Sequence, residues 1–390
     1  MKKTSILTIL LAAAVLYSTS CGSPAPSWLA GPATVQELLD GVEGLGNLAL
    51  AANQNSVLIA GSRKQSGDVP LVCFAVEATP EGTITNRTVL TALEPDQELL
   101  DIEAGCGGDG NADFAVVVVV ERASAGDEAL YWQIPAGGQP SEVVQLELAA
   151  GDDEQVVVRD LHVVLLGNET FLFYGADAFA SAENLNSAML LTKIGEQPVT
   201  LGRYPSTLLW EITRAAAGAG EFAIARSWRQ GEVFATALSL FDSGGSLLAG
   251  PRVLFTAKYL FDTVFTWDAL RKEFALLWGT SHRYWFQRIA LEEGELKRRL
   301  SPSVEIRFDA AVTAIRPETG RYVVVLQDGH RLFSRPISTE GEFAGDAREL
   351  VGIGETGNRR LHVLAHAWCA ERLAVLLSFG ENFAYRLLQP

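Results

Sequence analysis

A short pattern recurs about every fifty residues along this chain. A polar or charged residue is followed by an aromatic or aliphatic one and then by a run rich in Val, Ala, Leu and Ile, as at residues 113–117 and 273–277. The apolar first positions of the seven copies are 48 to 57 residues apart, at Val57, Phe114, Phe171, Phe222, Phe274, Tyr322 and Leu373. Such a period is typical of repeat architectures, in which each unit buries apolar surface against its neighbours. The chain is therefore predicted to fold as seven similar units.

Each unit carries the signals of four β-strands. A first strand precedes the repeated run, as at residues 209–212, and a third follows it, as at 234–238. A turn that contains glycine follows the third strand and leads to a fourth, more polar strand. These turns lie at residues 80–83, 137–138, 195–196, 243–246, 293–295 and 339–342. Glycine suits a tight hairpin because it adopts a positive φ without steric cost.

Seven units of four antiparallel strands resemble a seven-bladed β-propeller. The resemblance covers residues 33–390 and implies an all-β ring in which stacked blades bury each other's faces. The last unit ends after its third strand at residues 383–387, while residues 33–39 read like the outer strand at 142–148. We therefore expect an N-terminal strand to complete the last blade and close the ring.

Two structural alternatives remain open from the sequence. Residues 33–39 contain good helix formers and could form a short amphipathic helix instead. The strands could also divide into two or three sandwich or barrel domains, although no linker rich in Pro, Gly and Ser interrupts the period.

The composition indicates a folded, acidic protein. Of the 390 residues, 48% are hydrophobic, which excludes intrinsic disorder because enough apolar area is present to bury a core. The 47 Asp and Glu residues outnumber the 31 Lys and Arg residues, for a formal charge of −16. Without a block of basic residues, this balance argues against nucleic acid as a partner.

The N-terminus resembles the signal of bacterial lipoproteins. Two lysines precede an apolar run at residues 6–15 that is too short to cross a bilayer, and small polar residues lead to Cys21. The resemblance implies a signal peptide at 1–20, lipidation of Cys21, a flexible tether at 21–32 and a lipid-anchored location in the bacterial cell envelope, facing the periplasm or the cell surface. The alternative is an ordinary signal peptide with Cys21 incidental.

One loop resembles the calcium loop of integrin-type FG-GAP propeller repeats. Asp109 and Asp113 match two of the ligand positions, while Gly105 and Gly107 occupy two others. A weak Ca²⁺ site is the one cofactor that the sequence suggests. An ordinary turn rich in Gly and Asp is the alternative.

Three cysteines remain if Cys21 is lipidated, so at most one disulfide can form. We expect the third strand of the first unit and the first strand of the second to share an interface. Cys73 and Cys106 are therefore the predicted pair, with buried free thiols as the alternative.

The sequence contains no recognised catalytic constellation. A Gly-x-Ser-x-Gly nucleophile turn is absent, and residues 352–357 only imitate a nucleotide loop because no helix is predicted after them. His362 and His366 share one strand face in the predicted fold, about 13 Å apart, too far for one zinc ion. These observations favour a binding protein over an enzyme.

In propellers, partners dock on the loops that join blades and that join the second strand to the third. In this sequence those positions include Arg203, Tyr204, Trp228, Arg229, Lys258, Tyr259, His282 and Arg283. Trp, Tyr and Arg dominate binding hot spots, although such residues also serve as solvated caps. We expect a non-catalytic binding or scaffold module for an envelope protein or glycan. The alternatives are an envelope enzyme acting on polysaccharide or a small metabolite in the central funnel, and a structural assembly factor.

Overall fold

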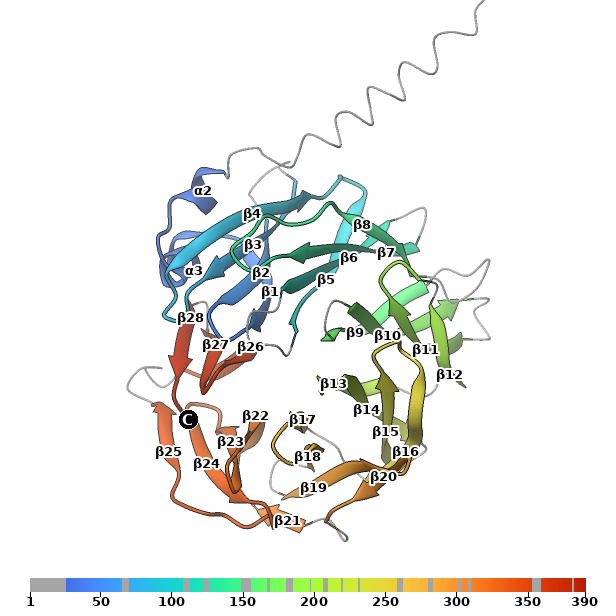
Figure 1. The fold of residues 1–390 in the computed structure, drawn as a ribbon. Coiled ribbons are helices and arrows are strands. Elements are labelled where there is room, and N and C mark those ends of the chain that lie inside the picture. Colours follow the sequence, from blue (N-terminus) through green and yellow to red (C-terminus); the bar gives the residue numbers. More distant parts are fainter. Residues whose placement is uncertain are drawn as a thin grey trace, which may run out of the picture.

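The computed structural model describes residues 26–64, 70–107, 113–122, 126–148, 156–166, 169–179, 185–196, 198–205, 210–218, 220–230, 232–257, 262–279, 283–300, 304–307, 310–352, 359–380 and 382–390. Its strands form antiparallel sheets that follow one another along the chain (Figure 1). The first three are β1 (Leu45–Ala52), β2 (Val57–Arg63), β3 (Val72–Ala78) and β4 (Ile84–Ala92); β5 (Gln97–Cys106), β6 (Phe114–Arg122), β7 (Gly126–Ile134) and β8 (Val144–Glu147); and β9 (Val156–Leu166), β10 (Glu169–Phe179), β11 (Leu185–Lys193) and β12 (Val199–Pro205).

The next four sheets continue in the same order. They are β13 (Trp210–Ala217), β14 (Glu221–Gln230), β15 (Val233–Asp242) and β16 (Leu247–Ala257); β17 (Asp262–Asp268), β18 (Glu273–Gly279), β19 (Arg283–Glu292), β20 (Glu295–Arg298) and β21 (Val304–Arg307); β22 (Ala311–Glu318), β23 (Arg321–Gln327), β24 (Leu332–Ser338) and β25 (Arg348–Val351); and β26 (Leu361–Cys369), β27 (Arg372–Phe379) and β28 (Asn382–Leu388). In the fifth, β20 and β21 both pair with β19. The predicted seven-bladed β-propeller, mostly with four antiparallel strands per blade, is confirmed.

The repeated apolar run forms the second strand of each blade, which is buried on both faces. Its first positions are at most 1% exposed in every blade, at Val57, Phe114, Phe171, Phe222, Phe274, Tyr322 and Leu373. A strand covered on both faces needs a continuous apolar run rather than an alternating one. The sequence pattern therefore locates the middle of each blade.

The blades pack face to face around a closed ring. In the described parts of the chain, seven apolar clusters each join two neighbouring blades. The cluster that decides closure joins Leu376 of β27 and Tyr385 of β28 to Val57 and Phe74 of the first blade. Because the last blade packs on the first, separate sandwich domains are excluded.

The two sides of the ring differ in the turns that they carry. The turns from first to second strand and from third to fourth strand lie on one side, the hairpin face; the remaining loops lie on the other, the loop face. As predicted, a glycine with positive φ occupies the third-to-fourth turn of the first six blades, at Gly82, Gly137, Gly195, Gly245, Gly294 and Gly341.

The expected N-terminal strand is wrong, because residues Val35–Gly41 form the helix α3. The Thr34 side chain accepts a hydrogen bond from the Glu37 backbone N–H at 3.2 Å, and the Glu37 carboxylate accepts one from the Thr34 N–H, which completes a capping box. Val35, Leu38 and Leu39 have helical spacing and are buried against blades one and seven. The last blade keeps three strands, and the helix covers its outer strand β28 (Figure 1).

One side-chain amide makes hydrogen bonds to the edge of β28 that a fourth strand would otherwise make. Gln36 of α3 accepts a hydrogen bond from the Tyr385 backbone N–H at 3.0 Å and donates one to the Phe383 carbonyl at 3.2 Å. These two backbone groups lie on the free edge of β28. Covering an edge in this way protects it from pairing with another chain.

The folded body begins earlier than the predicted boundary at residue 33. The short helix α2 (Ser27–Ala30) lies within the predicted tether, and its Leu29 is fully buried. Trp28 packs edge-on against Phe74 with ring centroids 5.5 Å apart, and the Arg63 guanidinium lies 4.6 Å from the Trp28 ring centroid. The signal peptide at 1–20 and the lipidation of Cys21 fall outside the described residues.

Candidate functional site

The strand register places the described members of the predicted docking set on the loop face. Arg203 and Tyr204 lie at the loop-face end of β12, Trp228 and Arg229 at that of β14, and Arg283 begins β19. Arg283 is exposed and its Nε lies 3.9 Å from the Glu305 carboxylate of β21. The other members, Lys258, Tyr259 and His282, lie outside the described residues. A role in binding stays a prediction for all of them.

The predicted calcium loop is described only in part. Asp109 lies outside the described residues, whereas Asp113 directly precedes β6 and its carboxylate accepts a hydrogen bond from the Gln133 side chain at 2.9 Å. Over the residues that the structure describes, no three His, Cys, Asp or Glu side chains group so as to hold a metal ion. Calcium therefore remains a prediction from the sequence.

The predicted disulfide between Cys73 and Cys106 is not formed, and both are free thiols. They do share the apolar cluster between the first two blades, as expected. However, Cys73 lies near the loop-face end of β3, whereas Cys106 lies at the hairpin-face end of β5. Burial raises the pKa of each thiol to about 12, and the charges of Asp113 and Cys369 add to this effect at Cys106. Both thiols therefore stay protonated at neutral pH.

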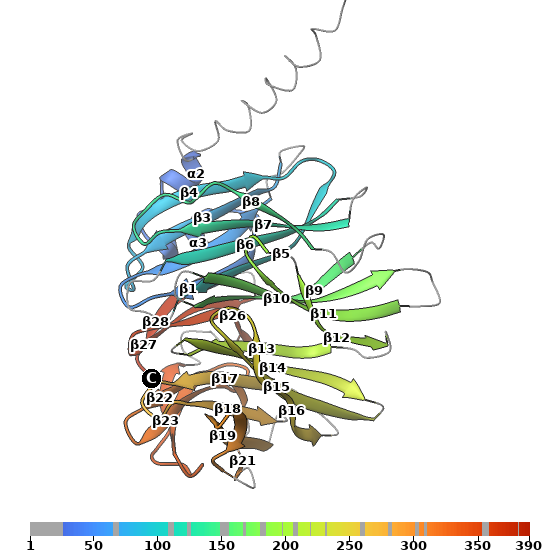
Figure 2. The same cartoon turned by 45° about the vertical axis from the view of Figure 1, so that its right-hand side comes forward.

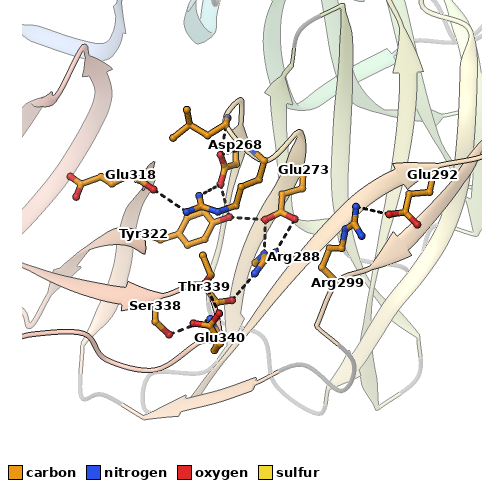
Figure 3. Close-up of polar contacts among 12 residues, drawn as sticks. Asp268, Glu273, Arg288, Glu292, Arg299, Glu318, Tyr322, Ser338, Thr339 and Glu340 are labelled. Carbon is orange, nitrogen blue, oxygen red and sulfur yellow. Dashed lines mark hydrogen bonds and ion pairs between the residues drawn. The ribbon is translucent and has the colours of Figure 1, made fainter. Parts of the chain in front are cut away.

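A cluster of charged groups that the sequence reasoning missed lies at the junction of blades five and six (Figure 3). This junction cluster consists of Asp268, Arg271, Glu273, Arg288 and Tyr322. Asp268 and Glu273 flank the turn between β17 and β18 and are at most 1% exposed. The Tyr322 hydroxyl at the start of β23 lies 2.7 Å from the Asp268 carboxylate and 3.1 Å from that of Glu273. One tyrosine of blade six thus contacts both buried acids of blade five.

Two arginines neutralise the acids of the junction cluster. Arg271 Nη1 donates to Asp268 at 2.5 Å, and Arg288 holds Glu273 through Nε at 2.5 Å and Nη2 at 3.3 Å. Burial, together with the two carboxylates, raises the pKa of Tyr322, so its hydroxyl stays protonated and donates. Since the acids are buried and already paired, this arrangement suits a structural tie between blades rather than a reacting site.

One signal in the sequence could have pointed to this cluster. Tyr322 is the only one of the seven repeat positions whose apolar ring carries a hydroxyl. A buried tyrosine hydroxyl usually needs a polar partner, which predicts a polar neighbour in the adjoining blade. The identity of that partner could not be predicted, because Asp268 is 54 residues away in the chain.

Arginines reach across the neighbouring junctions as well. Arg252 of β16 donates to the Leu296 carbonyl of blade five, and Arg288 donates to the Thr339 carbonyl of blade six at 3.0 Å. Arg316 of β22 donates to the Ala370 carbonyl of blade seven at 3.4 Å, and Arg372 forms an ion pair with Glu81 of blade one at 2.9 Å. Four consecutive junctions therefore combine apolar packing with a directional contact from arginine.

Comparison with known proteins identifies the fold and no family. No family model matches the sequence, and no curated protein gives a significant match. A prolyl endopeptidase structure aligns with a TM-score of 0.56 at 13% identity, over 100% of this chain and 53% of that chain. The β-propeller domain of the Trilobed protease from Pyrococcus furiosus aligns with a TM-score of 0.47 at 8% identity, over 87% of this chain and 93% of that chain. The Trypanosoma rangeli sialidase gives a TM-score of 0.45 at 9% identity, over 89% and 54%.

The present chain thus spans about half the length of the prolyl endopeptidase chain that it matches. At identities this low, the likeness shows a shared propeller fold. Among the described residues, no helix is long and apolar enough to cross a membrane.

Three acidic residues lie opposite one another at the loop-face end of blade two. Glu98, Glu121 and Asp127 are register partners on β5, β6 and β7. Asp127 is 8% exposed, and its carboxylate accepts a hydrogen bond from the Val158 N–H at 2.7 Å. Burial raises the pKa of Asp127, the bond from Val158 partly offsets this, and the Glu121 charge raises the pKa further. The row therefore destabilises the blade at neutral pH.

Asp127→Asn is expected to stabilise the protein at pH 7. The amide oxygen can still accept from Val158, while the charge opposite Glu121 is removed, which should raise the free energy of unfolding by roughly 0.2–1 kcal/mol. Because the folded pKa of Asp127 lies above its ordinary value of 3.8, the natural protein gains stability as pH falls through that folded value, and the variant lacks this gain. Thermal melts across this pH range measure both effects. Exposed Asp96→Asn is the control; an equal gain there would contradict the argument.

Proposed function

We propose that this protein is a lipid-anchored binding or scaffold module of the bacterial cell envelope that presents its loop face to another protein or a glycan. The observation that carries the proposal is the placement of aromatic and cationic residues on that face. Arg203 with Tyr204, and Trp228 with Arg229, lie next to the last residues of β12 and β14 in adjacent blades. A closed ring holds the ends of these strands at a fixed spacing, and such pre-organisation lowers the entropic cost of binding a partner.

The described acidic clusters support a binding role over a catalytic one. At the junction of blades five and six, Asp268, Glu273 and Tyr322 are buried and hydrogen-bonded to one another or to arginines. A general acid or base must reach its substrate within hydrogen-bond distance. These groups therefore stabilise the contact between two blades. The function that we propose is recognition of a partner on the loop face.

Replacing Trp228 and Arg229 with alanine is expected to weaken capture of the natural partner at least about tenfold, the effect of losing a typical hot spot. The measurement is a cross-linked pull-down of the intact lipoprotein from its own envelope, with captured material quantified by mass spectrometry. Leu270→Ala is the matched control, since Leu270 is 69% exposed and lies in a hairpin-face turn. Equal capture by both variants would contradict loop-face binding.

The lipid anchor has its own test. Cys21→Ser is expected to move the protein from the membrane fraction to the soluble fraction, because stable anchoring requires the acyl chains. Mass spectrometry of the natural mature N-terminus should show an acylated cysteine at position 21. A start at another residue, or an unmodified thiol, would refute the anchor while leaving loop-face binding open.

A further inference from the structure

We infer that the rim formed by α2 and β4 faces the bilayer and that blades four and five point away from it. This orientation rests on the proposed lipidation of Cys21. Blade one, with α2 against its outer strand β4, lies across the ring from blades four and five (Figures 1 and 2). Two observations lead to the orientation, the fixation of the N-terminal segment and the length of chain before it.

The chain is fixed to blade one almost as soon as the described residues begin. Leu29 is fully buried in the cluster that closes the ring, and Trp28 lies between Phe74 and Arg63. Further along, the Pro32 carbonyl accepts a hydrogen bond from Arg87 of β4. The Ala33 carbonyl accepts one from the Ile84 N–H at 2.9 Å. Several independent contacts therefore hold this segment against the rim.

The distance from the predicted anchor to this fixed segment is short. Only four residues separate Cys21 from Pro26. In any conformation, five Cα steps extend to at most about 18 Å. A folded body of this size is about 50 Å across. The tether reaches only about a third of the width of the body. It therefore keeps the α2 rim nearest to the membrane, because turning the far rim toward the bilayer would need a longer tether.

Electrostatic attraction to lipid does not provide this orientation. Residues 1–205, which include the first three blades, contain 26 acidic and 9 basic side chains, whereas residues 206–390 contain 21 and 22. Anionic headgroups attract clusters of Lys and Arg, and the acidic half offers no such cluster. The orientation should therefore depend on the length of the tether and respond little to salt.

The orientation determines where the proposed docking residues lie relative to the membrane. The aromatic and cationic positions predicted for docking belong to blades three to five, at the end of β12, in β14 and at the start of β19. In this orientation the positions in blades four and five lie on the side of the ring that is far from the bilayer, whereas those in blade three lie between the two sides (Figure 1). The tether would thus present the docking residues to partners in the aqueous space rather than to the membrane that carries the protein.

Two exposed valines on outer strands provide a matched pair of reporter positions. Val89 of β4 is 36% exposed and Val253 of β16 is 49% exposed. Each is replaced by cysteine, labelled with a fluorophore, and the acylated protein is placed in vesicles that contain an acceptor dye on the lipid headgroups. The parent protein without a new cysteine reports background labelling, which should be small because burial raises the pKa of Cys73, Cys106 and Cys369.

The label at position 89 is expected to be quenched at least about twofold more strongly than the label at 253, since the two rims lie on opposite sides of a body about 50 Å wide. Insertion of about forty Gly and Ser residues between Ser23 and Pro24 should abolish the difference, because a flexible linker of that length spans about 35 Å. Equal quenching with the natural tether, in protein whose mass shows an acylated Cys21, would overturn the orientation alone. An unmodified Cys21 would overturn the anchor and the orientation together.

Discussion

Arg288→Met is expected to lower the free energy of unfolding by about 3–5 kcal/mol, the usual cost of leaving one member of a buried ion pair without its partner. Glu273 is 1% exposed, and Arg288 supplies two hydrogen bonds to its carboxylate (Figure 3). Methionine fills similar volume, so the loss reports the charge and its hydrogen bonds rather than a cavity. Chemical denaturation followed by circular dichroism measures the change.

Arg299→Met is the matched control for this result. Arg299 also pairs with a glutamate, Glu292, but the two side chains are 46% and 33% exposed. An exposed pair is worth about 0–1 kcal/mol, because water screens the charges. Similar losses in the two variants would show that burial does not set the value of the Glu273 contact, and the structural role of the junction cluster would fail.

Leu38→Ala is expected to cost about 2–5 kcal/mol, the range for truncating a buried leucine in a packed core. Leu38 of α3 is 1% exposed and packs in the cluster that joins blade seven to blade one. Its truncation leaves a cavity where the ring closes. Thermal and chemical denaturation both report the loss.

The same substitution at Leu270 isolates the effect of burial. Leu270 is 69% exposed, so Leu270→Ala should change stability by less than about 0.5 kcal/mol. A loss at Leu38 no larger than at Leu270 would mean that α3 does not contribute to closure. The three-stranded last blade would then depend on its strands alone.

The sequence reasoning was wrong where two local signals competed. Residues 33–39 resemble an outer strand, yet Thr34 and Glu37 also carry the spacing of a capping box. Both readings are locally consistent, and the choice depends on what lies beside the segment. The Gln36 amide satisfies the edge of β28 only when residues 35–41 are helical and seated against it.

The positions of the candidate site residues were also predicted only in part. The placement of Arg203 and Trp228 on the loop face follows from the order of the strands, which the sequence repeat predicts. The same strand order places Cys73, near the start of a third strand, and Cys106, at the end of a first strand, toward opposite faces, so the predicted disulfide overlooked a strand direction that the repeat already implied.

The sequence by itself determined the number of blades, the buried second strand of each and the glycine at six outer turns, because these features depend on local apolar patterning and on φ. Only the tertiary structure decided how the ring closes and which charges meet at the junction of blades five and six. Asp268 and Glu273 flank one turn of blade five, and Tyr322 of blade six becomes their neighbour only when the blades stack. Contacts between groups about fifty residues apart depend on the geometry of the whole ring, which no local pattern encodes.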